Sequence, residues 1–172
     1  MGRAKYLMWS LMFYRGWPTQ LVPTPALGDT QEPTDLDMEQ EHSFKTLKGA
    51  LGKIEEISHL SPSAEVCGFL GFDEDGDRFI VREEYNSSPW PFEYFLIDPI
   101  NYLLFKDKYH LVGVFHSHVM GDEKPSEFDV KMAQNCCIPF LIYSLNTKKI
   151  HIHEPQNGEC NVNILRRMRA LV

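Results

Sequence analysis

Cysteine is scarce in this chain, and the spacing of the cysteines does not suggest a disulfide framework. The 172 residues contain four cysteines, two of them adjacent, and no Cys-x-x-Cys pair occurs. Such spacing excludes the regular disulfide scaffold of small secreted domains. We therefore expect free, mostly buried thiols in a reducing compartment, which favours a cytoplasmic location. The cysteines are Cys67, Cys136, Cys137 and Cys160.

Long apolar runs, positive charge and internal repeats are also missing. No apolar stretch reaches the length of a transmembrane helix, so no membrane association is expected. The 17 basic and 24 acidic residues give a net charge of -7, which argues against nucleic-acid binding as the main function. With 43% hydrophobic and 24% charged residues, the composition is that of an ordinary soluble globular protein.

The N-terminal region lacks both a clear targeting signal and a core-forming pattern. Arg15 closes a nine-residue apolar run, and no small-x-small cleavage site follows. Residues 18–41 contain four prolines and six acids without one basic residue, which predicts a flexible or surface-draped linker. The first seventeen residues either dock on the protein or are disordered. We predict an N-terminal extension over residues 1–41 and one folded domain over residues 42–172.

The remainder of the chain alternates irregularly between strand and helix patterns. This order predicts a mixed α/β fold, with a mainly antiparallel β-sheet flanked by helices. Hydrophobic periodicity and turn residues predict a helix over 41–59, strands over 66–72 and 78–85 joined by the DEDGD turn, a strand-like segment over 92–97, a helix from Asp98 to about 108, a strand over 111–118, a helix from Ser126, strands over 139–145 and 148–154, and a helix over 162–172.

The stretch GVFHSHVMGDEKPSEFDV (residues 113–130) has the residue types of a metal site. Residues two apart on a strand point to the same face, so His116 and His118 project together. A catalytic zinc typically takes three protein ligands and keeps one open position. Asp129 lies in the first turn of the following helix, where the helix N-terminus favours an ionised carboxylate, and it can supply the third ligand.

Each part of this pattern also has a purely structural interpretation. Ser126-x-x-Asp129 is a helix-capping pattern. A second His-x-His, formed by His151 and His153, has no acid or serine at comparable spacing, and we expect it on the exposed face of a late strand. The full combination His-Ser-His-x7-Ser-x2-Asp is much more specific than its parts.

That combination resembles the zinc signature of the JAB/MPN (JAMM) metallopeptidases, in which an upstream glutamate precedes His-x-His-x7-Ser-x2-Asp. The segment SAEVCGFLG (63–71) is similar to the opening strand of the family and places Glu65 at the glutamate position. The segments YFLIDPINYL and IPFLIYSL resemble further parts of prokaryotic members. The resemblance covers roughly residues 42–155 and implies an MPN/JAB fold with a cytidine-deaminase-like architecture, of the bacterial or phage stand-alone type.

The resemblance also implies a role for each signature position. His116, His118 and Asp129 would bind one catalytic Zn²⁺. Glu65 would be the general base that takes a proton from water and returns it to the leaving amine. Ser126 would donate a hydrogen bond to the oxyanion of the tetrahedral intermediate.

Several neighbours of the signature have other expected roles. Ser117 points to the opposite face from the two histidines and is expected to pack or to support the ligands. Cys67 shares the face of Glu65, but a fourth protein ligand would close the site, so we expect a small buried residue. Trp90, Phe92 and Tyr94 either line a peptide groove or pack on the core. The acids expected to be solvated surface groups are Asp122, Glu123 and Glu127.

Three functions are compatible with these residues. The resemblance implies first a zinc metallo-isopeptidase or peptidase that acts at the C-terminal tail of a ubiquitin-like protein, as in antiphage or sulfur-carrier pathways. A phage tail-assembly peptidase is a second enzyme of the same chemistry. A zinc-free MPN scaffold that only binds partner proteins is the alternative of a different class, although such relatives usually lose one of the signature residues. A nucleic-acid deaminase is excluded, because its His-x-Glu and Pro-Cys-x-x-Cys motifs are absent.

Overall fold

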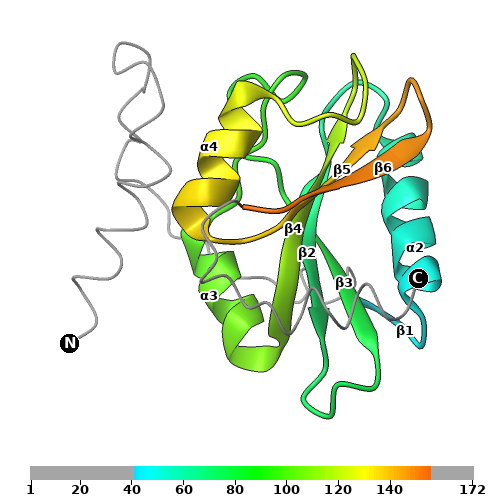
Figure 1. The fold of residues 1–172 in the computed structure, drawn as a ribbon, viewed down its shortest axis with the longest axis vertical. Helices are drawn as coiled ribbons and strands as arrows, with labels where there is room; N and C mark the ends of the chain where they lie inside the picture. The colour runs from blue at the N-terminus through cyan, green and yellow to red at the C-terminus, as the bar shows by residue number, and fades with distance from the viewer. Residues whose placement is uncertain (1–40, 156–172) are drawn as a thin grey trace, which may run out of the picture.

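The computed structural model describes residues 41–155, which contain one six-stranded sheet in the order β1-β3-β2-β4-β5-β6. Neighbouring strands are antiparallel except for the parallel pair β4–β5. The prediction of a mixed α/β fold is therefore confirmed (Figure 1). Along the chain the elements are β1 (Glu41–Phe44), α2 (Leu47–Leu60), β2 (Cys67–Phe72), β3 (Phe79–Glu84), α3 (Pro99–Lys108), β4 (His110–His118), α4 (Glu127–Cys136), β5 (Phe140–Ser144) and β6 (Lys149–His153).

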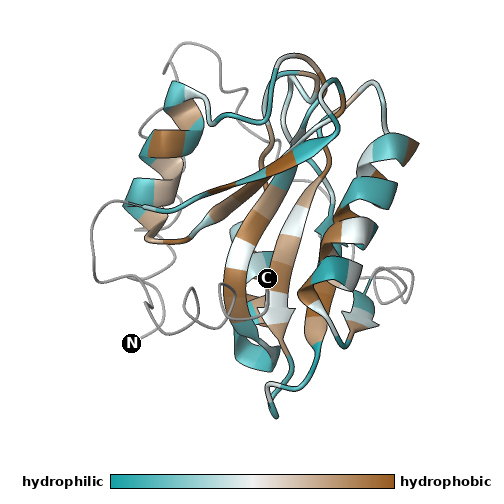
Figure 2. Cartoon of the chain, turned by 45° about the vertical axis from the view of Figure 1, so that its right-hand side comes forward, coloured by the Kyte–Doolittle hydropathy of each residue, from teal (hydrophilic) through white to brown (hydrophobic). Residues whose placement is uncertain are grey.

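Helices cover both faces of this sheet (Figure 1). On one face, the buried side chains of α2 form an apolar cluster with Leu70 and Phe115. On the other face, α3 and α4 contribute to a second cluster with Phe69, Val114 and Phe140. The strands between the two helix layers are largely apolar in Figure 2. The sheet is thus buried on both sides, which explains why its central strands are continuous apolar runs.

Strand β4 carries the two candidate metal-binding histidines on the face covered by α4. Val114 belongs to the cluster on that face and Phe115 to the cluster on the opposite face. Because strand side chains alternate, His116 and His118 lie on the same side as Val114. Strand β4 pairs with β2 on one edge and with β5 on the other, so its position is fixed from both sides.

Helix α4 is the crossover between the parallel strands β4 and β5, and it begins where the sequence predicts. Ser126 is its N-cap, and Ser126 and Asp129 form a reciprocal capping box. Helix α3 also begins as predicted, because the Asp98 side chain accepts a hydrogen bond from the Ile100 N–H and Pro99 follows it. The capped start of α4 lies after the end of β4, so the first turn of the helix is available to the histidines.

The predicted helix over 41–59 is wrong at its N-terminal end. Residues Glu41–Phe44 form strand β1, which pairs with the edge of β3, and the helix begins after Thr46. The Thr46 hydroxyl accepts a hydrogen bond from the Gly49 N–H at 3.1 Å. Phe44 matches the helical spacing of the following residues, but periodicity within one segment carries no information about pairing with a distant strand.

The strand-like segment 92–97 is not a strand. Its hydrogen bonds go instead to the preceding loop, where Asn86 Oδ1 accepts from Leu96 N at 3.1 Å and Ser87 N donates to Leu96 O at 2.9 Å. Phe95 and Ile97 are buried, and this burial explains the apolar alternation. The apolar alternation therefore indicated correctly which side chains are buried, but it did not indicate whether the backbone pairs with a neighbouring strand.

Several predictions fall outside the described residues. These are the flexible extension, apart from Glu41, the C-terminal helix over 162–172, and Cys160. Within residues 41–155, Cys67, Cys136 and Cys137 are free thiols, as expected, but only Cys67 is buried, whereas Cys136 is half-buried and Cys137 is exposed. No helix in this range combines the length and the apolar character needed to cross a membrane.

Candidate metal centre

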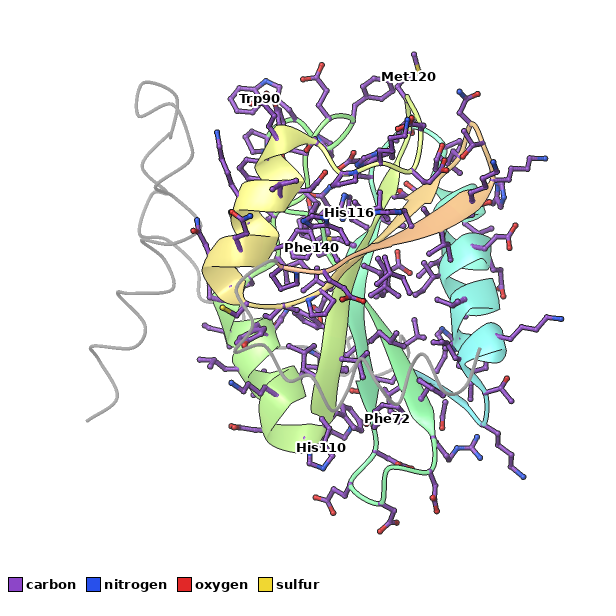
Figure 3. All side chains as sticks on the ribbon, in the orientation of Figure 1. Phe72, Trp90, His110, His116, Met120 and Phe140 are labelled. Carbon is purple, nitrogen blue, oxygen red and sulfur yellow. The ribbon has the colours of Figure 1, made fainter. Side chains whose placement is uncertain are left out.

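His116 and His118 converge through the same ring nitrogen. Their Nε2 atoms lie 3.2 Å apart, and the His116 side chain is almost completely buried between the sheet and α4 (Figure 3). Burial lowers the pKa of His116 below its usual value, although the nearby Asp129 acts in the opposite direction. A neutral imidazole with an available lone pair is the form that binds a metal ion.

Asp129 completes the group from the first turn of α4. Its Oδ1 lies 3.2 Å from His116 Nε2, and its Oδ2 lies 3.4 Å from His118 Nε2. Burial alone would raise the pKa of Asp129, but the two imidazoles and the Ser126 hydroxyl hold it well below its usual range. The carboxylate is therefore ionised and buried, and it faces two imidazole nitrogens.

This donor set fits a divalent cation of the zinc type. Two imidazole nitrogens and one carboxylate oxygen lie within 4.8 Å of one another, and among the described residues no other group of histidine, cysteine and acidic side chains meets this condition. Nitrogen and oxygen donors in a set of three are characteristic of catalytic zinc sites, which keep a position open. The predicted ligands His116, His118 and Asp129 are thus brought together as one possible metal-binding group.

The two imidazoles are held in different ways. His118 Nδ1 lies 2.8 Å from the backbone carbonyl oxygen of Asp122. Among the described residues His116 Nδ1 has no hydrogen-bond partner, and its ring is stacked on Phe95 with centroids 4.4 Å apart and meets Phe140 in a T-shaped contact. Hydrogen bonding fixes one ligand and aromatic packing fixes the other. Sequence reasoning missed both partners, because a backbone carbonyl has no residue-type signal and Phe95 follows a loop far from the motif.

Glu65 is buried just before β2 and lines the same cleft as His118 and Asp129. Its backbone is fixed by hydrogen bonds from its N–H to Pro91 O and from Asn86 Nδ2 to its carbonyl oxygen. Burial raises the pKa of Glu65 to about 8, with smaller contributions from His118, which lowers it, and from nearby carboxylates, which raise it. A glutamate in this condition is able to hold or release a proton near neutral pH.

Ser126 acts in the structure as the cap of α4 and as a partner of Asp129. Its Oγ donates to Asp129 Oδ2 at 2.6 Å and accepts from Asp129 N at 3.1 Å, while its backbone N–H donates to the same Oδ2 at 2.8 Å. The capping interpretation of Ser126-x-x-Asp129 is confirmed. Capping and metal binding are compatible, because the cap uses Oδ2 and leaves Oδ1 directed at His116.

A cleft of about 480 Å³ opens above these residues. Phe92 and Tyr94 line it, and each is more than a third exposed, so two of the three loop aromatics fit the groove interpretation. Trp90 does not line the cleft. Figure 3 shows Trp90 and Met120 at the same end of the molecule, beyond His116. The residues lining the cleft are Glu65, Phe92, Glu93, Tyr94, Phe95, His118, Met120, Gly121, Asp122, Lys124, Pro125, Ser126, Phe128 and Asp129.

The neighbours of the signature mostly follow the sequence predictions. Ser117 is fully buried on the opposite face, where its Oγ accepts a hydrogen bond from Val66 N at 3.0 Å. Cys67 is fully buried in the apolar cluster on the α4 side, and burial raises the pKa of its thiol well above the usual value. Asp122 and Glu127 are exposed, and Glu123 is half-buried.

The second His-x-His lies elsewhere than predicted. His151 and His153 are half-buried, not exposed, because they pair in register with Ile142 and Phe140 and therefore face the same side of the sheet as α4. Neither belongs to the candidate metal-binding group. The exposure prediction failed because β6 was assumed to have one solvated face, whereas helices cover both faces of the sheet.

Comparison with known proteins finds a matching family and several similar solved structures. Residues 48–156 match the family described as prokaryotic homologs of the JAB domain. The solution structure of protein DSY2949 from Desulfitobacterium hafniense is 30% identical, with 62% of this chain and 78% of that chain covered and a TM-score of 0.49. The solution structure of a protein from Salinibacter ruber is 19% identical, with 68% and 94% covered and a TM-score of 0.42.

No protein of curated function matches the chain significantly. The family match runs from the first turn of α2 to beyond the end of β6 and includes every residue of the candidate metal centre, whereas strand β1 lies before it. On this match over more than half of its length, the chain belongs to the family of prokaryotic homologs of the JAB domain.

Proposed function

We propose that this protein is a zinc-dependent metallopeptidase or isopeptidase that hydrolyses a bond at the C-terminal tail of a ubiquitin-like protein. The observation that carries the proposal is the convergence of His116, His118 and Asp129 in an open cleft that is also lined by a buried glutamate, Glu65. Ionisable groups that are buried against charged or polar partners in a cleft cluster at functional sites. Membership in the JAB family supports the same chemistry.

His116, His118 and Asp129 would hold the zinc ion. When bound, zinc supplies Lewis acidity that polarises a carbonyl group and makes water more acidic. The protein supplies two imidazole nitrogens and an ionised carboxylate, and the cleft leaves room for substrate beside them. Three protein ligands are the number expected where a coordination position must stay open for catalysis.

Glu65 would move the proton. Its carboxylate would take a proton from the attacking water and deliver it to the nitrogen of the leaving amine. The burial that raises its pKa to about 8 supports this role, because a general base works best when its pKa is near the working pH.

Ser126 would donate a hydrogen bond to the oxyanion. In the structure its single hydroxyl proton is directed at Asp129 Oδ2, so the hydroxyl must rotate away from Asp129 to reach a substrate. The backbone N–H of Ser126 also donates to Oδ2, and it would continue to hold the carboxylate after that rotation. One oxyanion donor is typically worth a factor of about 10²–10³ in rate.

The cleft fits an extended peptide segment more readily than a folded surface. Phe92, Tyr94 and Met120 present partly exposed apolar side chains along it. A flexible C-terminal tail can lie along such apolar groups while its backbone passes the candidate metal centre. The precursor of a phage tail component would present the same type of segment, so it is the second substrate class.

Two measurements test the proposal. The full-length protein, purified with zinc, should contain one equivalent of metal and lose it to a chelator. The zinc-loaded protein should then cleave a reporter fused to the C-terminal tail of a ubiquitin-like protein, through either a peptide or a lysine isopeptide bond. Metal well below one equivalent would favour the zinc-free scaffold, and cleavage restricted to phage tail precursors would favour the second enzyme.

A further inference from the structure

The turn between β5 and β6 is tied to the loop that orients His118. Since a carbonyl oxygen only accepts hydrogen bonds, the 2.8 Å contact between His118 Nδ1 and Asp122 O requires a proton on Nδ1. In the neutral ring, Nε2, the nitrogen that faces His116 and Asp129, then keeps its lone pair. The carbonyl of Asp122 thus favours the neutral tautomer in which His118 presents a lone pair to the candidate metal centre.

That carbonyl lies in residues 119–126, a loop without regular secondary structure. Gly121 has a φ of +91°, which only glycine adopts without strain. Within the loop, Asp122 Oδ1 accepts a hydrogen bond from Lys124 N at 3.0 Å, and contacts from outside the loop add to this support. One such contact is the hydrogen bond from Ser144 Oγ to Gly121 O at 2.9 Å.

Ser144 is completely buried at the end of β5, in register with His118. Its Oγ accepts a hydrogen bond from Thr147 N at 3.1 Å, so its one proton is directed at Gly121 O. The next residue, Leu145, donates from its N–H to His118 O at 3.1 Å. The end of β5 is therefore bound to the backbone of His118 and to the loop that holds its ring.

A second hydrogen bond joins the β5–β6 turn to the loop of residues 119–126. Thr147 Oγ1 donates to Glu123 Oε2 at 2.6 Å, and Glu123 follows Asp122 directly. The two hydrogen bonds, one to Gly121 O and one to Glu123 Oε2, lie on either side of Asp122 in the sequence. Turning the Asp122 carbonyl away from His118 would therefore disturb the contacts between this loop and the β5–β6 turn.

We propose that Ser144 and Thr147 are positioning residues for the zinc ligand His118, acting through residues 121–123. Neither residue contacts the metal-binding atoms, and neither belongs to the His-x-His or Ser-x-x-Asp pattern. The zinc part of this inference rests on the proposed function. The tautomer part concerns the protein itself and is measurable without metal.

The first test measures zinc affinity of the full-length protein by competition with a chelator. Ser144→Ala removes the donor to Gly121 O and should raise the zinc dissociation constant about 10–100-fold, the usual effect of losing a residue that orients a metal ligand. Thr147→Val keeps the hydrogen bond from its backbone N–H to Ser144 Oγ but removes the bond to Glu123, and it should also raise the zinc dissociation constant. Ser58→Ala is the matched control, because Ser58 is also fully buried and its Oγ donates to a backbone carbonyl, that of Ile54, on the other face of the sheet.

The second test uses the ¹⁵N chemical shifts of the His118 ring in metal-free protein. At alkaline pH, where the ring is neutral, the wild type and Ser58→Ala should show the Nδ1–H tautomer alone, and Ser144→Ala should show a mixture of the two neutral tautomers. A merely structural role would lower the stability of Ser144→Ala and Ser58→Ala alike without changing the tautomer. If Ser144→Ala does not fold, the zinc dissociation constant and the His118 tautomer are both measured in Thr147→Val.

The outcomes separate this inference from the proposed function. A wild-type protein that takes up one zinc, with dissociation constants of Ser144→Ala and Thr147→Val within about twofold of it, would overturn the positioning role alone. A wild-type protein that binds no zinc would overturn the proposed function and the zinc part of the inference. In that case, an unchanged Nδ1–H tautomer in Ser144→Ala and Thr147→Val would also overturn the tautomer part of the inference.

Discussion

At the scale of single residues, Asp129 combines two tasks that need the same charge. As the N3 residue of a capping box, it has a carboxylate that accepts hydrogen bonds from the Ser126 N–H and hydroxyl. As a candidate ligand, it faces the Nε2 atoms of His116 and His118. Both tasks stabilise the ionised form, so the pKa of Asp129 stays well below its usual range despite burial. A capping pattern is therefore no argument against a ligand at the same position.

The ligand assignment predicts a contrast between the two His-x-His pairs. His116→Ala should abolish stoichiometric zinc binding, because it removes one of three donors from a buried group. His151→Ala should leave one equivalent bound, since His151 does not belong to that group. Zinc content by atomic spectroscopy of the purified full-length variants gives the answer. Full occupancy in His116→Ala, or loss in His151→Ala, would contradict the assignment.

Glu65→Gln should separate metal binding from catalysis. The amide has nearly the volume of the carboxylate but is unable to accept the proton, so zinc content should stay at one equivalent. Hydrolysis of the tail fusion should fall by about 10²–10⁴-fold, the usual contribution of a general base. Steady-state rates at saturating zinc measure this effect. Turnover close to that of the wild type would remove Glu65 as the base.

The pKa of Glu65 also predicts how the stability of the metal-free protein depends on pH. Burial raises this pKa from 4.5 to about 8, so between these values the folded protein keeps a proton that the unfolded chain releases. The free energy of unfolding should therefore fall as pH rises through this window, whereas below it both states are protonated and the contribution is constant. Urea unfolding of chelator-treated protein between about pH 5 and pH 8 measures the slope.

In Glu65→Gln this slope should become shallower, because the amide does not titrate. Glu74→Gln, in the exposed turn between β2 and β3, is the control for removing one carboxylate and should keep the wild-type slope. Equal slopes in the wild type and both variants would show that Glu65 does not carry the raised pKa.

At the scale of elements, two helix caps allow the roles of Ser126 to be separated. Ser126→Ala and Thr46→Ala each remove a side chain that accepts a hydrogen bond at a helix N-terminus, and each should lower the free energy of unfolding by about 1 kcal/mol. Only Ser126→Ala should also reduce hydrolysis, by about 10²–10³-fold, since its hydroxyl would stabilise the oxyanion. Denaturant unfolding and hydrolysis rates of both variants make the comparison. Equal rates in the two variants would limit Ser126 to capping.

The elements also show what the sequence was able to predict. The caps at Asp98 and Ser126 and the strand of His116 and His118 depend on local patterns, and the structure has them as predicted. Strand β1 was missed because its pairing partner, β3, is distant in sequence. The carbonyl of Asp122 was missed for a related reason, since a backbone contact depends on how the loop is held and not on which side chain it carries.

At the scale of the whole molecule, β1 closes one edge of the sheet through side chains as well as backbone. Glu41 lies 3.5 Å from Arg82 of β3 and 2.8 Å from Lys108 at the end of α3, and it accepts a hydrogen bond from the Tyr109 hydroxyl at 2.7 Å. Arg82 in turn donates to the buried Glu84 at 2.6 Å. The first strand thus connects β3 with the α3–β4 junction, on the opposite side of the sheet order from β5 and β6.

This network predicts that the N-terminal extension ends before Glu41 and not after it, one residue earlier than the sequence suggested. Deletion of residues 1–40 should leave one equivalent of zinc bound and the urea midpoint close to that of the full chain. Deletion of residues 1–44 removes β1 and leaves Arg82 and Lys108 without Glu41, so it should lower stability by about 2 kcal/mol or more, equivalent to a Tm about 5 °C lower. Thermal unfolding and zinc content of the two truncations provide the test. A large loss of stability after removal of residues 1–40 alone would mean that the extension packs on the domain, and equal stability of the two truncations would show that β1 contributes little to the sheet.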